Sequence, residues 1–256
     1  MKKQLIASAL SLLAFASMVP AGVAGPAETP VVVLSAGAAK VAVLRLSEVL
    51  RQREGIGARL QFDTVGAILK RLEAGESPDV VIVTAEAAKT LREKGRLAGE
   101  AKALGKVRIG VCAKEGAAKP DLSSPEAFKK TLLKAKSVAY VDPAKGATSG
   151  IHFAKVLEKL GIAQAMASKT VLVASGSSAE KVVSGEAELC VQQVTEILPC
   201  KGAKLVGLLP DSLQKTTTYS AAVMAKAAHA ERARRFVEYL AGAAGRIEFG
   251  KAGFSR

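Results

Sequence analysis

A short loop rich in small and hydroxyl-bearing residues stands between a strand-like run and a helix-like run. Asp142 to Gly150, DPAKGATSG, follows the apolar SVAYV and leads into IHFAKVLEKLGI. Thr148 and Ser149 supply hydroxyl groups, Lys145 supplies a cation, and the first backbone N–H groups of a helix attract negative charge. Three interpretations are open: an ordinary turn, a loop for nucleotide phosphates, or a site for another small anion.

Motifs for nucleotide binding and for serine hydrolysis are absent from the sequence. There is no GxxxxGK[ST] phosphate loop, and no GxGxxG opens a helix after the first strand-like run. The stretch 175–178, SGSS, lacks the Gly-x-Ser-x-Gly frame of a hydrolase nucleophile. An ordinary turn or a site for another anion is therefore favoured over nucleotide chemistry.

Similar small polar or glycine-containing segments follow the other strand-like runs. In open parallel sheets a ligand binds beyond the carboxyl ends of the strands, so these segments are expected to meet at one cleft. Each segment alone is read equally well as an ordinary helix cap, whereas several together would form an anion site. The candidate ligand-binding residues are Ser35, Ala36, Gly37, Thr64, Val65, Gly66, Lys145, Thr148, Ser149 and Gln193.

Asp63 conflicts with an anion site, because a carboxylate repels a negative ligand. We expect Asp63 to point away from the cleft, to cap a helix, or to pair with a basic group such as Lys40. If Asp63 instead faces the cleft, a cationic or amine-bearing ligand is favoured.

The three cysteines, Cys112, Cys190 and Cys200, allow one disulfide and one free thiol. Pairing of Cys190 with Cys200 is the simplest arrangement, because these two are nearest in the sequence. No CxxC occurs, and the only histidines, His152 and His229, lie far apart. We predict no metal site and no cofactor.

From Pro30 onward, strand-like and helix-like runs alternate along the chain. Apolar runs such as VVVLSA (31–36), DVVIVT (79–84) and VRIGVCA (107–113) are followed by amphipathic runs that end at glycine or begin at serine and proline. This alternation predicts an α/β fold in which mostly parallel sheets are flanked by helices. Two such series predict two lobes, one formed by 26–108 with 220–256 and the other by 109–219.

The first 25 residues have the pattern of a signal peptide. Lys2 and Lys3 precede the apolar LIASALSLLAFASM, and Gly22 and Ala24 suit a cleavage site. We therefore expect residues 1–25 to be removed from an exported, periplasmic protein. No later segment is long and apolar enough to anchor it in a membrane.

The charge is strongly positive, but its distribution argues against nucleic-acid binding. Without Lys2 and Lys3 the formal charge falls from +14 to +12, and the basic residues are scattered rather than clustered. There is no tryptophan, and seven Phe and three Tyr offer few surfaces on which bases could stack. We expect a solvated basic surface, with small anions as partners and no nucleic acid.

Five segments in order resemble the periplasmic solute-binding proteins of the molybdate-binding type, over nearly the whole mature chain. They are SAGAAK, DTVGAILKRLEAGESPDVVIVTAEA, VAYVDPAKGATSGIHFAKVLEKLGI, GEAELCVQQVTEI and ERARRFVEYLAGAAGRIEFGKAGF. The resemblance implies a two-lobed clamshell, expected to be monomeric, that binds a small anion between its lobes and delivers it to an ABC permease.

By position, Ser35 matches the serine that follows the first strand in that family. Two departures concern the ligand. The segment 63–66 replaces consecutive serines, and Gln193 stands where a tyrosine is frequent. A tetrahedral oxyanion is therefore less secure than the fold, and the loop 142–150 suits a carboxylate or a larger anion. A protein that binds a cationic or neutral solute is the remaining binding hypothesis.

Aconitate isomerases are exported enzymes similar to molybdate-type binding proteins, and this implies an alternative function. Isomerisation of an unsaturated tricarboxylate requires a base that moves an allylic proton, and cations or N–H groups that hold the carboxylates. Lys145 and His152 are the candidate catalytic residues, although His152 near the start of a helix is also read as a packing residue. The favoured hypothesis remains a binding protein without turnover.

Overall fold

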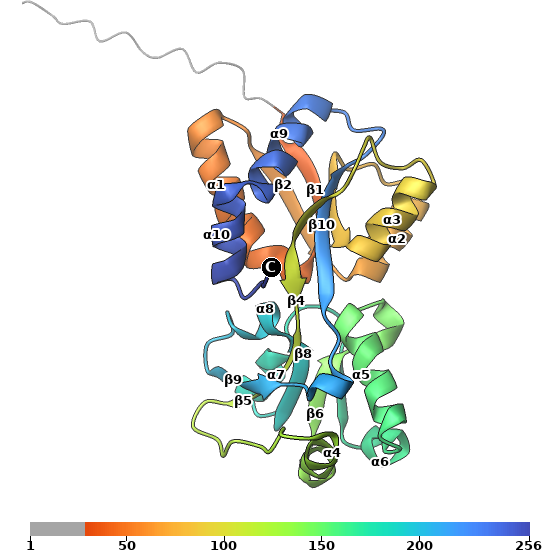
Figure 1. Cartoon of the computed structure of the whole chain (residues 1–256), viewed down its shortest axis with the longest axis vertical. Coiled ribbons are helices and arrows are strands. Elements are labelled where there is room, and N and C mark those ends of the chain that lie inside the picture. Colours follow the sequence, from red (N-terminus) through yellow and green to blue (C-terminus); the bar gives the residue numbers. More distant parts are fainter. Residues whose placement is uncertain (1–28) are drawn as a thin grey trace, which may run out of the picture.

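The computed structural model describes residues 29–256, and the predicted signal peptide at 1–25 lies outside the described residues. Two lobes lie one above the other in Figure 1, and each is built on a five-stranded sheet flanked by helices. This arrangement confirms the predicted fold class. No helix between residues 29 and 256 has both the length and the apolar character needed to cross a bilayer.

Lobe 1 contains a sheet with the order β2-β1-β3-β10-β4. The strands β2, β1 and β3 are parallel, and β10 pairs antiparallel with β3 and β4. The helices α1 and α10 lie on one side of this sheet in Figure 1, and α2 and α3 lie on the other. The strands are β1 (Val31–Ala36), β2 (Ala58–Asp63), β3 (Val80–Thr84), β4 (Lys102–Val107) and β10 (Thr217–Val223); the helices are η1 (Gly37–Ala39), α1 (Lys40–Glu54), α2 (Val65–Glu73), α3 (Ala85–Glu93), α9 (Ala230–Ala241) and α10 (Ala243–Lys251).

Lobe 2 repeats this plan with the order β7-β6-β8-β5-β9. Here β6 is parallel to β7 and β8, and β5 runs antiparallel to β8 and β9. The strands are β5 (Ile109–Lys114), β6 (Val138–Val141), β7 (Thr170–Val173), β8 (Leu189–Gln193) and β9 (Ala203–Leu208); the helices are α4 (Pro125–Lys134), η2 (Pro143–Lys145), α5 (Thr148–Lys159), α6 (Ala163–Ala167), α7 (Ala179–Val183), α8 (Val194–Ile197) and η3 (Asp211–Leu213).

The chain passes between the lobes twice. The first crossing lies between the end of β4 at Val107 and the start of β5 at Ile109, next to the predicted boundary at 108/109. The second lies between η3 and the start of β10 at Thr217. The predicted boundary at 219/220 falls inside β10, because the whole of that strand pairs with β3 and β4 in lobe 1.

A buried carboxylate ties the last helices to the centre of lobe 1. Asp79, 2% exposed, accepts the backbone N–H of Val32 at 2.8 Å and that of His229 at 2.9 Å. The Nδ1 atom of His229 lies 3.2 Å from Oδ2 of Asp79, the same oxygen that accepts the N–H of Val32. Burial alone would raise the pKa of Asp79, but these hydrogen bonds outweigh it and lower the pKa. The charged carboxylate therefore stabilises the junction of β1, β3 and the chain that enters α9.

The cysteines do not pair as their spacing suggests. Cys112 of β5 lies directly opposite Cys190 of β8, and their Sγ atoms are 2.6 Å apart. Both thiols are fully buried, whereas Cys200, which follows α8, is partly exposed. Cys112, rather than the predicted Cys200, is thus the neighbour of Cys190.

We expect oxidation of the folded protein to join Cys112 to Cys190, because cross-strand neighbours reach disulfide geometry with little backbone movement. Peptide mapping under non-reducing conditions, after treatment with oxidised glutathione, should recover the Cys112–Cys190 cross-link. Cys200→Ser should leave this cross-link intact. Recovery of Cys190 joined to Cys200 would contradict the arrangement.

Candidate functional site

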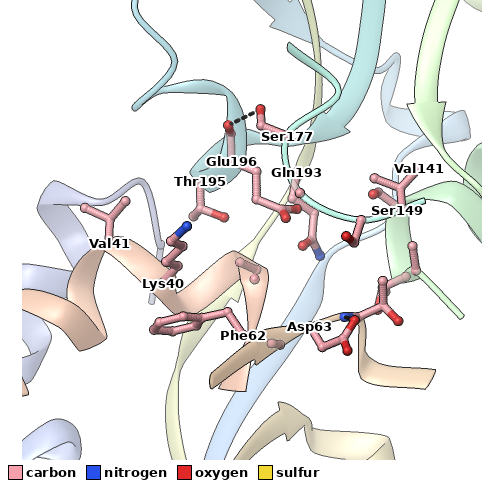
Figure 2. Close-up of a pocket in the computed structure, with 18 of the residues that line it drawn as sticks. Lys40, Val41, Phe62, Asp63, Val141, Ser149, Ser177, Gln193, Thr195 and Glu196 are labelled. Carbon is pink, nitrogen blue, oxygen red and sulfur yellow. Dashed lines mark hydrogen bonds between the residues drawn. The ribbon is translucent and has the colours of Figure 1, made fainter. Parts of the chain in front are cut away.

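A cavity of about 500 Å³ lies between the lobes, and side chains of both form its walls. Figure 2 shows Lys40, Phe62 and Asp63 on one wall, with Gln193, Thr195 and Glu196 across from them. The lining residues are Ala36, Gly37, Ala38, Lys40, Val41, Leu44, Phe62, Asp63, Thr64, Val65 and Tyr219 of lobe 1, and Val141, Ala147, Thr148, Ser149, Ser175, Gly176, Ser177, Glu180, Gln193, Thr195, Glu196, Pro199 and Cys200 of lobe 2.

The carboxyl ends of four strands open onto this cavity. β1 ends at Ala36 and β2 at Asp63 in lobe 1, while β6 ends at Val141 and β8 at Gln193 in lobe 2. Each is followed by the start of a helix, where the first backbone N–H groups have no acceptor within the helix. Two sheets thus direct several helix N-termini at one space, and the dipole of each favours negative charge there.

Seven of the ten candidate ligand-binding residues line the cavity: Ala36, Gly37, Thr64, Val65, Thr148, Ser149 and Gln193. The other three, Ser35, Gly66 and Lys145, are not among the lining residues. Ser35 is fully buried inside lobe 1, and its Oγ donates to the carbonyl of Ala36 at 3.1 Å. The serine hydroxyl is therefore already occupied.

Gly66 and Lys145 take part in a direct contact between the lobes, which we call the interlobe contact (Thr64 and Gly66 with Lys145 and Gly146). The N–H of Gly66 donates to the carbonyl of Gly146 at 3.1 Å, and the Thr64 hydroxyl donates to the carbonyl of Lys145. The Thr64 oxygen also accepts the N–H of Ala67 at 3.1 Å, which caps α2. These groups hold the lobes together, and of the four residues only Thr64 also lines the cavity.

Gln193 makes a second bridge between the lobes. Its side-chain amide and the hydroxyl of Tyr219 exchange hydrogen bonds of 2.6 and 2.9 Å, although Gln193 belongs to lobe 2 and Tyr219 to lobe 1. Burial, with a further contribution from the nearby Glu196 carboxylate, raises the pKa of Tyr219 well above its usual value. Tyr219 therefore presents a neutral hydroxyl at the cavity wall.

Lys40 is the one cationic side chain among the residues that line the cavity. It is the first residue of α1, and its Nζ atom lies 5.8 Å from the centre of the Phe62 ring. Asp63 also lines the cavity, so it does not point away from it as expected. Its Oδ1 accepts the N–H of Thr64 at 2.8 Å, and its negative charge is close enough to the Arg71 guanidinium to help raise the pKa of Arg71, so a basic group other than Lys40 partly offsets it. In residues 29–256 no ion pair joins Asp63 to Lys40, so the ammonium group is available to a ligand.

Glu196 places a carboxyl group at the cavity without a cationic partner in the described part of the chain. It lies in α8, and its Oε1 would be 2.9 Å from a Cβ atom built on Gly37, so it lies against the first lobe. Burial raises the pKa of Glu196 to about 7, against a smaller opposing effect of the Gln192 side chain. The group can therefore gain or lose a proton near neutral pH.

Thr195, next to Glu196, has an unused hydroxyl. The residue is 2% exposed, and its Oγ1 has no hydrogen-bond partner among the residues that the structure describes. A buried hydroxyl without a partner costs about 1–3 kcal/mol, so such a group at a cavity wall indicates a site for an acceptor or donor from outside the chain.

Sequence reasoning missed Thr195, Glu196 and Tyr219. Thr195 and Glu196 directly follow β8, so the rule that places ligands beyond strand ends could have included them. Tyr219 lies near the start of β10, opposite Thr84 at the end of β3, because the two strands are antiparallel. A search limited to residues at the carboxyl ends of strands would therefore not have found Tyr219.

The two candidate catalytic residues of the alternative hypothesis lie elsewhere. His152 and Lys145 are not among the residues that line the cavity. The Nε2 atom of His152 lies 2.7 Å from the carbonyl oxygen of Leu213, which connects α5 to η3. Groups of three or more metal-ligating side chains are likewise not found within residues 29–256.

The profile of the family described as bacterial extracellular solute-binding protein matches residues 31–255. The chain belongs to this family. Among curated relatives, the aconitate isomerase of a Pseudomonas species is 35% identical over 220 residues, which is 83% of this chain and 82% of that protein.

Solved structures show the same fold at low sequence identity. The periplasmic molybdate-binding protein of Azotobacter vinelandii has a TM-score of 0.74 at 19% identity and covers 88% of this chain and 99% of its own. The sulfate-binding protein of Mycobacterium tuberculosis has a TM-score of 0.66 at 15% identity, and the match covers 89% of this chain and 86% of that protein. A periplasmic thiamin-binding protein has a TM-score of 0.69 at 16% identity, and the match covers 88% of this chain and 82% of that protein. At such identities these structures support the fold alone.

The raised pKa of Glu196 predicts a pH-dependent stability that Glu196→Gln removes. A carboxyl group whose folded-state pKa is above its unfolded value stabilises the fold fully below about pH 4.5 and loses this contribution as the pH rises through about 7. The free energy of unfolding of the wild type, measured in urea relative to Glu196→Gln, should therefore fall by up to about 3 kcal/mol between pH 4.5 and pH 8.

Glu158→Gln is the matched control, because it removes the same charge from an exposed position of lobe 2 outside the cavity. The difference in free energy of unfolding between Glu158→Gln and the wild type should change by less than about 0.5 kcal/mol between pH 4.5 and pH 8. An equal pH dependence in both variants would contradict the assignment.

Proposed function

We propose that this protein captures a small organic anion carrying carboxylate groups, and that its two lobes close around this ligand. The observation that carries the proposal is the convergence, on one interlobe cavity, of the starts of α1 and α5 with Lys40, which makes no ion pair within residues 29–256. The curated relative supports the ligand class, because aconitate carries carboxylates. Hinge closure would bring both walls into contact with the ligand at once.

The size of the cavity favours a ligand larger than a tetrahedral oxyanion. A volume of about 500 Å³ corresponds to roughly 17 water molecules at about 30 Å³ each. A central atom with four oxygens would leave most of this space to water. A di- or tricarboxylate offers separate carboxylates to Lys40 in lobe 1 and to Thr148 and Ser149 in lobe 2, which line the same cavity.

The polar groups of the cavity suffice for useful affinity. Hydrogen bonds to a charged acceptor contribute roughly 1.5–3 kcal/mol each, so five or six of them exceed the cost of immobilising the ligand and closing the lobes. Affinity in the micromolar range corresponds to about 8 kcal/mol. Ser149 and Thr195 supply hydroxyl groups on walls that are themselves buried.

Family membership and the predicted signal peptide support a periplasmic location, and delivery to an ABC permease is part of this proposal. A protein of this kind would bind its ligand outside the inner membrane and release it to the permease when the lobes open. The formal charge of about +12 without Lys2 and Lys3 suits a protein that collects anions, since it raises their local concentration.

Substitution of Lys40 separates an anionic from a cationic ligand. In a thermal-shift panel of molybdate, sulfate, malonate, citrate, cis-aconitate, trans-aconitate and simple amines at matched ionic strength, we expect a polycarboxylate to raise the melting temperature. A ligand at a hundred times its Kd adds about 2.7 kcal/mol. Lys40→Met should weaken that binding by about tenfold or more, and Asp63→Asn should leave it equal or stronger.

Lys70→Met is the matched control, because Lys70 is an exposed lysine of lobe 1 outside the cavity lining. It should bind like the wild type. Loss of binding in Asp63→Asn together with retention in Lys40→Met would reverse the assigned ligand charge. Stabilisation by sulfate or molybdate alone would replace the carboxylate with an oxyanion.

A second candidate function, isomerisation of an unsaturated polycarboxylate, is favoured by one observation. The curated aconitate isomerase is 35% identical over 82% of its own length, whereas the binding proteins of known structure cited above are all below 20% identical. Relatives at this level share a fold and often a site, so the same cavity would bind the substrate and carry out a proton shift.

Turnover is tested directly by proton NMR. We expect cis-aconitate incubated with the mature protein to give trans-aconitate, and the reverse reaction to approach the same ratio. The vinyl proton of each isomer gives its own signal, so both isomers are followed in one sample. Binding without any interconversion at protein concentrations near 10% of substrate would leave the protein a receptor and remove this second function.

A further inference from the structure

We propose that Glu196 is the proton-transfer residue of the interlobe cavity and that its substrates are unsaturated polycarboxylates with an acidic C–H next to the double bond. This inference rests on the proposed carboxylate-binding function and deepens it. It replaces Lys145 and His152, which lie outside the cavity lining, with a carboxyl group that is part of it.

The position of Glu196 suits this role. Its carboxyl oxygen lies against Gly37, at 2.9 Å from the place a Cβ atom would occupy, and Gly37 precedes the start of α1. Lys40, three residues further along, lines the same cavity. A carboxylate held by Lys40 and the N-terminus of α1 would therefore place the rest of a substrate beside Glu196. Glycine at position 37 provides the space that this contact requires.

No cation neutralises Glu196 among the residues that the structure describes. The titratable groups around the cavity are Lys40 from α1, Asp63 from the end of β2, Glu180 from α7, Cys200 after α8 and Tyr219 from β10. Of these, Tyr219 is fully buried, and the Glu196 charge contributes to its raised pKa. A partly buried carboxyl group without a counter-ion is costly, and such groups concentrate at sites of proton transfer.

The chemistry balances with the residues present. The Glu196 carboxylate takes a proton from the CH₂ group adjacent to the double bond, so a C–H bond breaks and an O–H bond forms. The released electron pair delocalises over the allylic carbons and the attached carboxylate, which Lys40 stabilises. Glu196 then returns the proton to the other allylic carbon, and the double bond has moved without oxidation, reduction or an added reactant. A return to the original carbon after rotation gives the geometrical isomer.

The test compares the wild type with Glu196→Gln and with the control Glu158→Gln. Binding is measured by thermal shift with cis- and trans-aconitate, and proton transfer by NMR in D₂O, where interconversion is followed directly and deuterium replaces any proton that exchanges with solvent on Glu196 before its return. We expect Glu196→Gln to lose interconversion and deuterium incorporation by at least about 100-fold. Its affinity for either isomer should remain within about threefold, and Glu158→Gln should behave like the wild type in all three measurements.

A pH profile adds a signature that a merely structural role would not give. The wild-type rate should rise through a single ionisation near neutral pH, because the base must lose its proton before it can act. The proposal would be overturned if Glu196→Gln still exchanged substrate protons with the solvent. It would also be overturned if the wild-type rate did not rise with pH near neutrality. Binding of aconitate by a wild type that neither isomerises it nor exchanges its protons would also overturn it, yet leave the carboxylate-binding function intact. If no polycarboxylate binds, both proposals fall together.

Discussion

The approach of Gly66 to Gly146 is the contact on which the closed cleft depends. A Cβ atom on Gly66 would lie 2.6 Å from the Cα of Gly146, and a Cβ on Gly146 would lie 2.5 Å from the Cα of Gly66. Two backbones can approach this closely only where neither residue carries a side chain. The close approach allows the Gly66 N–H to donate a hydrogen bond to the Gly146 carbonyl. Gly146 also has φ of +72°, which glycine adopts readily.

This contact determines what the loop Asp142–Gly150 does. Asp142 accepts the N–H of Ala144 at 2.9 Å and so starts η2, and Gly146 ends that short helix in a left-handed conformation. The loop is thereby bent so that its middle reaches lobe 1, while Thr148 and Ser149 at its end line the cavity. One segment thus contacts the other lobe at 145–146 and lines the cavity at 148–149. The sequence left an ordinary turn, a nucleotide-phosphate loop and a site for another anion as alternatives. The structure shows a turn whose middle contacts lobe 1 and whose end lines the cavity.

Much of the fold could be predicted from the sequence because its central strands are buried on both faces. VVVLSA and DVVIVT are continuous apolar runs, and the strands β1 and β3 lie within them. The strands β4 and β9 were missed because they lie at sheet edges, are half exposed, and contain lysine and glycine. The residues that line the cavity could be predicted as far as strand ends reveal them. The sequence does not indicate whether a given N–H or hydroxyl faces a ligand or the other lobe. The Gly66 N–H and the Thr64 hydroxyl were predicted to contact a ligand, whereas in the structure they donate to carbonyl groups of lobe 2.

The charge balance of the cavity follows from the same closure. Lys40 and the helix N-termini favour an anion, and the burial that closure produces makes the Glu196 carboxylate costly, with a pKa of about 7. An anionic ligand beside Glu196 would raise that pKa further, so ligand binding would favour the protonated form of Glu196 and leave a smaller fraction ionised to act as the base. A higher pKa makes the carboxylate a stronger base but reduces the fraction that is ionised. A base poised near the ambient pH gives the best compromise between strength and population. In the proposed reaction, burial of one carboxyl group between two lobes would therefore link ligand capture to proton transfer, with Lys40 stabilising the charge that develops on the substrate.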